Sequence, residues 1–230
     1  MSTPTPPLYD VNFCFPVREL ENDRVKLTPF IPAQHADLFF QGSSSHPELY
    51  QHLPPGPFPS ATTFTEDYVH VHIQPNTGNI FYAIIDKTRT SRMDDGTNVP
   101  PTDIDFAGII GYIHGSPTHL SVEIGCIIVL PPFQRTHVTT DAVGLLLRYA
   151  LDLPTATPPG LGLRRVQWQT SEKNEASIRV AERMGFKREA RLIDGDPRAG
   201  TLGRHTVVFA ICWDDWENGG REQVARLMDR

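Results

Sequence analysis

The stretch from Phe106 to Thr170 constrains the fold more than any other part of the sequence. Residues 106–113 and 120–130 are rich in Ile and Val and flank a turn with Gly and Pro, so they predict two antiparallel strands at the centre of a sheet. From about Thr139 the apolar residues follow helical spacing, and residues 163–170 again predict a strand. This succession of strand, helix and strand indicates a βαβ crossover.

Elements on both sides extend the pattern to an α+β fold. Thr63 and Glu66 have the spacing of a capping box, which predicts the start of a helix, and Asn174 and Gly185 suit the two ends of another. We expect further strands over residues 24–30, 79–86, 188–193 and 204–213, and helices over residues 32–40, from residue 63, and over residues 175–184.

The 230 residues suffice for one domain with a large core. We expect residues 1–23, which start Pro/Thr-rich, to form an arm, residues 24–218 to form the domain, and residues 219–230 to form a polar tail. Residues 87–102 are polar and predict a long flexible loop. Residues 48–60 contain many prolines and predict an ordered surface loop.

Charge and composition argue against several classes of protein. The net charge is -6 and no run of Lys and Arg occurs, which disfavours binding to nucleic acid or to a membrane surface. An acidic surface suits a cationic acceptor or simply gives solubility. No stretch of about 18 apolar residues exists and the first residues do not resemble a signal peptide. Cys14, Cys126 and Cys212 lie far apart in apolar surroundings, which indicates buried thiols in a reducing compartment. We therefore expect a soluble cytoplasmic protein.

Two blocks of sequence resemble the central motifs of the GNAT superfamily of N-acetyltransferases. The first contains Ile124-Gly125 and runs on from Val129 to His137, and the second is Asn174-Glu-Ala-Ser-Ile-Arg-Val-Ala-Glu-Arg-Met-Gly-Phe186. The second block is especially similar to ribosomal-protein alanine N-acetyltransferases. The resemblance extends from about Arg24 to Trp216. It implies the GNAT fold, with a mixed, mostly antiparallel sheet of six or seven strands and about four flanking helices.

The same resemblance implies acetyl-CoA as co-substrate and no metal. In the family, the first block reads Gln or Arg, two residues, Gly, one residue, and Gly or Ala, and its main-chain amides hold the pyrophosphate at a helix start. Gln134 matches, but His137 and Thr139 stand at the glycine positions. A side chain at His137 restricts the backbone and adds bulk near a phosphate, whereas amide donation needs no glycine in an allowed turn. The resemblance assigns coenzyme binding to Ile127, Ile128, Val129, Gln134, Arg135, Thr136, His137, Val138, Thr139, Thr140, Asn174 and Ser177.

The resemblance also suggests residues for the chemistry. Glu123 lies where several GNAT enzymes keep a carboxylate that takes the amine proton through water; the alternative is a solvent-facing strand glutamate or the partner of an arginine. The tyrosine that many relatives use as an acid is replaced by Ala181, so Ser177 is the candidate donor, or else it binds coenzyme or packs. A main-chain amide in the gap between the strands of Ile128 and Trp168 would polarise the thioester carbonyl.

The acceptor pocket is expected between the first loops and the last hairpin. Its aromatic and histidine candidates are often core residues in other proteins. The pair His70 and His72 has poor spacing for a metal chelate on a helix, because residues two apart face different directions. Loops over residues 48–60 and 194–203 should frame the acceptor. The candidates for the acceptor pocket are Tyr50, Phe58, Tyr82 and His205.

These expectations converge on an acetyl-CoA-dependent N-acetyltransferase. It would transfer acetyl to a primary amine, either a protein N-terminus or a small amine, by direct attack on the thioester. The alternative is a catalytically impaired CoA-binding or regulatory relative, since the glycines and the tyrosine are missing. The expected partners are a CoA thioester and an amine acceptor, not nucleic acid or a membrane, and the chain is expected to be a monomer or a homodimer.

Overall fold

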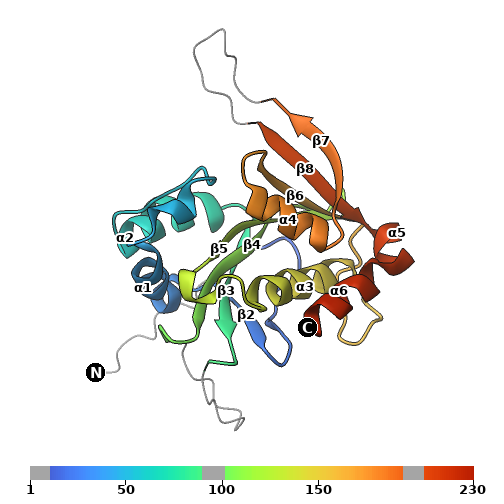
Figure 1. Ribbon diagram of the computed structural model, residues 1–230, viewed down its shortest axis with the longest axis horizontal. Helices are drawn as coiled ribbons and strands as arrows, with labels where there is room; N and C mark the ends of the chain where they lie inside the picture. The colour runs from blue at the N-terminus through green and yellow to red at the C-terminus, as the bar shows by residue number, and fades with distance from the viewer. Residues whose placement is uncertain (1–10, 90–101, 194–204) are drawn as a thin grey trace.

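The computed structural model describes residues 11–89, 102–193 and 205–230. Its centre is one mixed sheet of eight strands in the order β1-β2-β3-β4-β5-β6-β8-β7, which Figure 1 shows with its helices. Every neighbouring pair is antiparallel except β5 and β6, which are parallel. The strands are β1 (Leu20–Glu21), β2 (Val25–Pro29), β3 (Ile80–Asp86), β4 (Phe106–Ser116), β5 (Ser121–Val129), β6 (Arg165–Ser171), β7 (Lys187–Leu192) and β8 (Thr206–Cys212).

The helical segments cover both faces of the sheet. On β3, Phe81 packs against Tyr68 in the helical segment of residues 64–73, while its neighbour Tyr82 faces Tyr112, whose hydroxyl donates to the carbonyl of Leu146 in the helix of residues 138–151. Both faces are therefore apolar, and β3 is buried along its whole length. The segments are α1 (Pro32–Ser43), η1 (Pro47–Tyr50), α2 (Ala61–Thr63), η2 (Phe64–Ile73), η3 (Pro131–Phe133), α3 (Val138–Leu151), α4 (Glu175–Arg183), α5 (Trp213–Asp215), η5 (Trp216–Gly220) and α6 (Arg221–Met228).

The α+β class and the βαβ crossover through β5, α3 and β6 are confirmed, as is the mixed, mostly antiparallel sheet. The helix over residues 175–184 also begins and ends where expected. The side chain of Asn174 accepts from the main-chain N–H of Ser177 at 3.1 Å, and Gly185 has φ +91°. The predicted capping box at residue 63 is wrong. The cap is Ser60, whose hydroxyl accepts from the main-chain N–H of Thr63 at 3.0 Å.

The described part of the expected arm is ordered and contains β1, so the sheet has one strand more than the six or seven that were expected. Leu20 in β1 pairs with Leu27, and Phe13 stacks on Tyr112 at 6.1 Å between ring centroids. The expected polar tail instead contains helix α6, which packs on α3. Val224 is fully buried there. Both ends pack on the domain because a few apolar side chains are enough to hold a short segment on a large core.

Arg24, just before β2, connects helices α3 and α6. Its guanidinium makes two hydrogen bonds to Asp141 in the first turn of α3, at 2.8 and 2.9 Å, and also donates to the carbonyl of Met228 in α6. Asp141 is completely buried. A buried carboxylate needs such a partner, because burial without one is costly.

The remaining predictions concern loops, thiols and membranes. Most of the expected flexible loop at 87–102 and all of the loop at 194–203 lie outside the described residues. Cys14, Cys126 and Cys212 are free and partly buried. Among the described helices, none has the length and apolar character needed to cross a membrane.

Candidate functional site

The two parallel strands separate and leave a cavity between them. β5 and β6 pair from Ser121 to Glu123, and beyond that point they share no ladder bond. The gap has a volume of about 620 Å³ and includes the position between Ile128 and Trp168 where the sequence analysis placed it. Its walls are Ile124 to Val129 of β5, Trp168 to Thr170 of β6, Lys173 to Ser177 and Val180 around α4, Gln134 and Thr139 near the start of α3, and Glu48, Leu49, Gln51, His52 and Leu53.

A β-bulge interrupts the pairing of β5 with β4, its neighbour on the other side. Gly111 pairs with Gly125 and Ile109 pairs with Ile128, so β5 has one extra residue between these pairs. Cys126 sits in the bulge with φ +53°. Cys126 and Ile127 therefore have no ladder partner on either neighbouring strand. Beyond Glu123, the main-chain groups of β5 that face β6 lie outside the β5–β6 ladder, where the amide-rich arm of a CoA thioester could pair with them.

The turn before α3 uses an unexpected left-handed residue. Arg135 has φ +60°, whereas His137 has φ −63°, which any residue adopts easily. The turn is fixed by Gln134, whose side chain donates to the Val129 carbonyl at 3.0 Å, and by Thr136, whose hydroxyl donates to the Phe133 carbonyl at 2.6 Å. A glycine is therefore not required at His137, and helix α3 starts directly after it with its first amide groups at the edge of the cavity.

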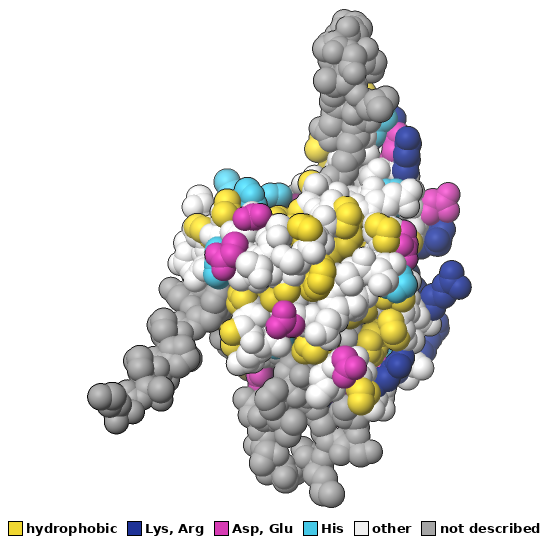
Figure 2. Space-filling view, turned by 90° about the vertical axis from the view of Figure 1, so that its left-hand side faces the viewer, with side chains coloured by type: hydrophobic (Ala, Val, Ile, Leu, Met, Phe, Trp, Pro, Cys, Tyr) yellow, Lys and Arg dark blue, Asp and Glu magenta, His cyan; other side chains and the backbone are white. Residues whose placement is uncertain are grey.

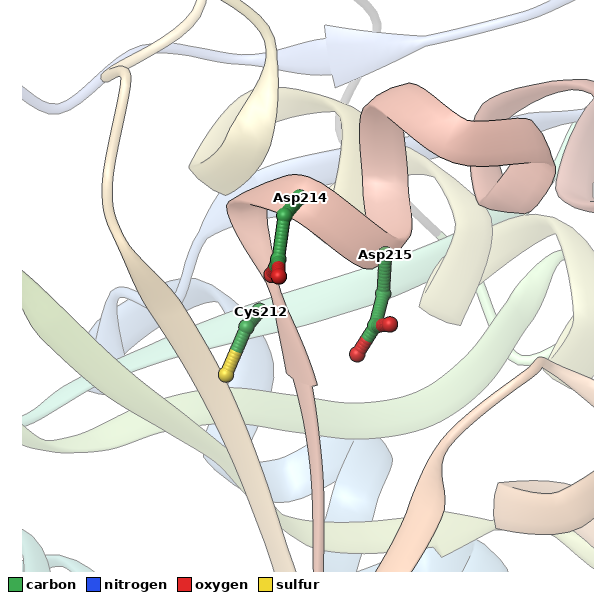
Figure 3. Close-up of side chains that lie close together, drawn as sticks. All are labelled: Cys212, Asp214 and Asp215. Carbon is green, nitrogen blue, oxygen red and sulfur yellow. The ribbon is translucent and has the colours of Figure 1, made fainter.

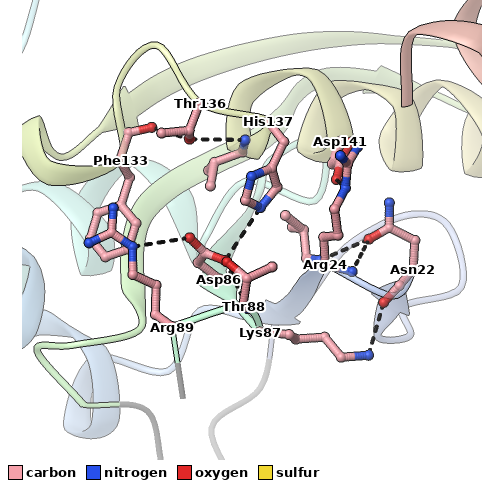
Figure 4. Close-up of polar contacts among 12 residues, drawn as sticks. Asn22, Arg24, Asp86, Lys87, Thr88, Arg89, Phe133, Thr136, His137 and Asp141 are labelled. Carbon is pink, nitrogen blue, oxygen red and sulfur yellow. Dashed lines mark hydrogen bonds and ion pairs between the residues drawn. The ribbon is translucent and has the colours of Figure 1, made fainter. Parts of the chain in front are cut away.

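The side chain of His137 turns away from the cavity. Its Nε2 lies 3.3 Å from Oδ1 of Asp86 at the end of β3, an ion-pair distance without hydrogen-bond geometry. Figure 4 shows the imidazole pointing at this carboxylate, which also accepts from Thr88 and lies 3.5 Å from Nε of Arg89. The crowding of a phosphate that the sequence suggested therefore does not arise. Of the segment from Gln134 to Thr140, the side chains that line the cavity belong to Gln134 and Thr139.

Helix α4 places two hydrogen-bonding residues on the cavity wall. Asn174 caps the helix through Ser177, as expected, and also lines the cavity. The hydroxyl oxygen of Ser177 accepts from Nε1 of Trp168 at 2.9 Å, so the Ser177 hydrogen remains available to donate. Ala181, at the position of the missing tyrosine, is fully buried and contributes no polar group.

Glu123 is buried at the point where the strands separate. Its Oε2 accepts hydrogen bonds from Nε2 of Gln167 at 3.2 Å and Nε2 of Gln169 at 3.0 Å, and it lies at hydrogen-bond distance, 3.1 Å, from Nδ1 of His114. It is thus neither a solvent-facing glutamate nor the partner of an arginine. Gln169 also lines the cavity and connects it to this cluster. The hydrogen bond with Glu123 raises the pKa of His114. Gln167 and Gln169, two apart on one strand face, were the signal that the sequence analysis missed.

The predicted acceptor residues lie elsewhere than on the cavity wall. Tyr82 is completely buried in the core, and Tyr50 is buried with its hydroxyl donating to Ser43 at 3.0 Å. Phe58 packs among aromatic rings, and His205 lies just before β8. In place of these four residues, the loop after α1 supplies the wall through Glu48, Leu49, Gln51, His52 and Leu53.

A separate cluster at the end of β8 joins Cys212, Asp214 and Asp215, whose potential ligand atoms lie within 4.8 Å of one another (Figure 3). The ammonium group of Lys187 already forms an ion pair with Asp215.

Comparisons with known proteins agree with this geometry. The profile of the family described as acetyltransferase (GNAT) domain matches residues 24–187. No curated protein matches the sequence significantly. A probable GNAT acetyltransferase from Chromobacterium violaceum is 25% identical, with a TM-score of 0.70 over 94% of this chain and 97% of that chain. A GCN5-related N-acetyltransferase from Brucella melitensis is also 25% identical, with a TM-score of 0.72 over 91% and 85%.

A more distant structure has a bound coenzyme. Spermidine N-acetyltransferase from Vibrio cholerae, solved with CoA and spermine, is 18% identical, with a TM-score of 0.59 over 86% of this chain and 100% of that chain. At this identity the likeness concerns the fold. The family profile, in contrast, covers more than half of the chain, from β2 to the first residue of β7. This protein belongs to the GNAT family of acetyltransferases.

Proposed function

We propose that this protein transfers an acetyl group from acetyl-CoA to a primary amine by direct attack on the thioester. The observation that carries the proposal is the fork between β5 and β6, whose ladder ends at Glu123 beside a cavity of about 620 Å³. A thioester arm entering the fork would pair with the main-chain groups of β5 that face it.

The coenzyme would lie between β5, β6 and the start of α3. The Val138 amide donates to the Thr136 hydroxyl at 3.3 Å, so the pyrophosphate would accept from the next main-chain amides of α3, starting at Thr139, where the helix dipole favours negative charge. Gln134, Thr139 and Asn174 would add side-chain contacts, because all three line the cavity. Coenzyme binding through main-chain groups would be compatible with residues other than glycine at His137 and Thr139.

The thiol of Cys126 is unsuited to carry the acetyl group. It lines the cavity, but burial raises its pKa to about 11. At neutral pH the sulfur is protonated and therefore a poor nucleophile. This favours a single transfer from coenzyme to amine over an acyl-enzyme intermediate.

Glu123 is the proposed base and Ser177 the proposed donor to the leaving sulfur. Hydrogen bonds with Gln167, Gln169 and His114 hold the Glu123 carboxylate in place. This carboxylate would take the amine proton, directly or through water. Ser177 faces the same cavity from α4 with a hydrogen free to donate, so it would stabilise the thiolate.

The acceptor is proposed to be a cationic amine, either small or a protein N-terminus. Residues 27–86 contain no Lys or Arg, and they include the loop that supplies Glu48 and His52 to the cavity wall. Figure 2 shows this side of the molecule, where acidic and histidine side chains lie among apolar ones and Lys and Arg gather at one margin. An amine acceptor is also what the Vibrio cholerae neighbour binds. The three free thiols suit the reducing cytoplasm as the site of this activity.

Calorimetry with acetyl-CoA, followed by assays of thiol release across a panel of primary amines, tests the proposal. We expect micromolar-range binding of acetyl-CoA and release of CoA thiol with at least one amine. No heat at millimolar coenzyme would refute the proposal. Binding without thiol release for any amine would favour the alternative of a catalytically impaired CoA-binding protein, which the buried Ala181 motivates.

A further inference from the structure

His114 reaches Glu123 because β4 bulges at this residue. Ile113 pairs with Glu123 and Ser116 pairs with Ser121, so β4 has one extra residue between these pairs. In a regular strand, the side chain after Ile113 would point to the opposite face from Glu123. His114 instead has φ +53°, a conformation unfavourable for a residue with a side chain, and its imidazole bonds to the carboxylate.

The two partners differ sharply in their access to water. The Glu123 side chain is 6% exposed, whereas the His114 side chain is 67% exposed. The other donors to the Glu123 carboxylate, Gln167 and Gln169, have amide groups that do not ionise. His114 is thus the titratable group that connects the buried carboxylate to solvent.

We propose that His114 is the residue through which the proton taken up by Glu123 leaves the site. The inference rests on the proposed amine acetylation. An ammonium acceptor first gives one proton to Glu123, and the neutral amine attacks the carbonyl carbon. The carbon–sulfur bond breaks, its electron pair stays on sulfur, and the second amine proton neutralises the thiolate. One proton therefore remains on Glu123 after each turnover and must be released.

The imidazole has the two nitrogens that this release needs. With its hydrogen on Nε2, the neutral ring accepts the proton from the carboxyl group at Nδ1 and releases one from Nε2 to water. Glu123 is the charged group that acts on His114, and the main-chain N–H of His114 contacts the neutral Asn79. Burial raises the pKa of the Cys126 thiol, and the Glu123 charge raises it further, so this thiol stays protonated. His114 thus acts through Glu123 as a positioning residue, without touching the acceptor.

Two variants remove the imidazole. His114→Gln keeps a donor of similar reach, and His114→Gly removes the side chain and relaxes the left-handed backbone, so the glycine variant should fold at least as well as the parent. On an amine that binds as ammonium, we expect both variants to lose about tenfold or more in kcat. Added imidazole should restore part of this rate, most strongly in His114→Gly.

A matched acceptor separates proton release from a structural role. A fluorinated analogue of the same amine has a low pKa and arrives neutral, so its acetylation releases no net proton. On this acceptor the variants should stay within about twofold of the parent. Coenzyme affinity and thermal unfolding, measured in parallel, should change little.

The possible outcomes separate the two proposals. A loss of kcat that is confined to the ammonium acceptor and is rescued by imidazole supports proton release through His114. Unchanged kcat on the ammonium acceptor, equal loss on both acceptors, or absence of rescue in a folded variant would overturn it. If the parent protein transfers acetyl to no amine, the proposed function itself fails, which is a different result from an active parent with unaffected variants.

Discussion

Replacing His137 with the glycine typical of the family should weaken the fold without improving the coenzyme site. His137 has φ −63°, so glycine brings no conformational benefit. Its side chain is 19% exposed and lies beside the Asp86 carboxylate, which is 2% exposed. His137→Gly removes a neighbour of a buried charge and leaves the coenzyme side of the turn unchanged.

The magnitude follows from the contacts that remain around Asp86. Oδ1 keeps its hydrogen bonds from the Thr88 main chain at 3.0 Å and the Thr88 hydroxyl at 2.6 Å. The loss is therefore up to about 1 kcal/mol for the polar contact with Asp86 and about 1 kcal/mol for the packed ring. For a chain of this size, a total of about 2 kcal/mol lowers Tm by roughly 4–8 °C.

Thermal unfolding and calorimetry with acetyl-CoA measure the two effects separately. Coenzyme affinity should change by less than about twofold in His137→Gly, because the proposed binding mode relies on main-chain amides. Thr139→Ala is the matched control: it lines the cavity and should weaken affinity severalfold with little change in Tm. A tenfold tighter complex in His137→Gly at unchanged Tm would show that the imidazole obstructs the phosphate, and would refute this reasoning.

Three further variants test the site and the fold. Glu123→Gln should lower kcat by about 10²–10³ at neutral pH and leave the Kd for acetyl-CoA unchanged, so unaltered turnover would remove Glu123 from the mechanism. Arg24→Ala leaves the buried Asp141 without its cationic partner and should lower the free energy of unfolding, measured with urea, by about 3 kcal/mol. A second change, Asp141→Asn, should recover much of this loss. Burial lowers the pKa of His35 from 6.5 to about 4. Because the unfolded chain binds this proton first, stability should fall between pH 6.5 and 4 by about 3 kcal/mol, and His35→Gln should show a flatter dependence.

The strands and helices around the site were predictable because local sequence and tertiary structure agree there. The apolar runs of β4 and β5 are long enough to fill the centre of a sheet, and Asn174 and Gly185 mark the ends of α4. The family motifs pointed to the segment near Gln134, and Gln134 does line the cavity. These features depend on residues close together in the chain, which a single sequence displays directly.

The chemistry near Glu123 was not predictable in the same way. His114 and Cys126 adopt left-handed conformations that sequence usually signals by glycine or asparagine. Strand pairing imposes both bulges, so no local pattern reveals them. The loop of Glu48 and His52 reaches the cavity through the packing of α1 and η2 rather than through a motif. Tyr50 and Tyr82 were mistaken for pocket residues because aromatic character alone does not separate core from surface.

The strand order has a consequence for synthesis of the chain. β8 lies between β6 and β7 but is the last strand to be made, after Glu172, α4 and β7 have emerged. Until residues Thr206–Cys212 leave the ribosome, the edge of β6 with Val166 and Trp168 has no partner. Exposed edges of apolar strands invite pairing with other chains. A fragment that stops at residue 187, where the family profile ends, lacks β8, so the edge of β6 would stay unpaired and the fragment should aggregate. In the 230-residue chain, β8 pairs with this edge.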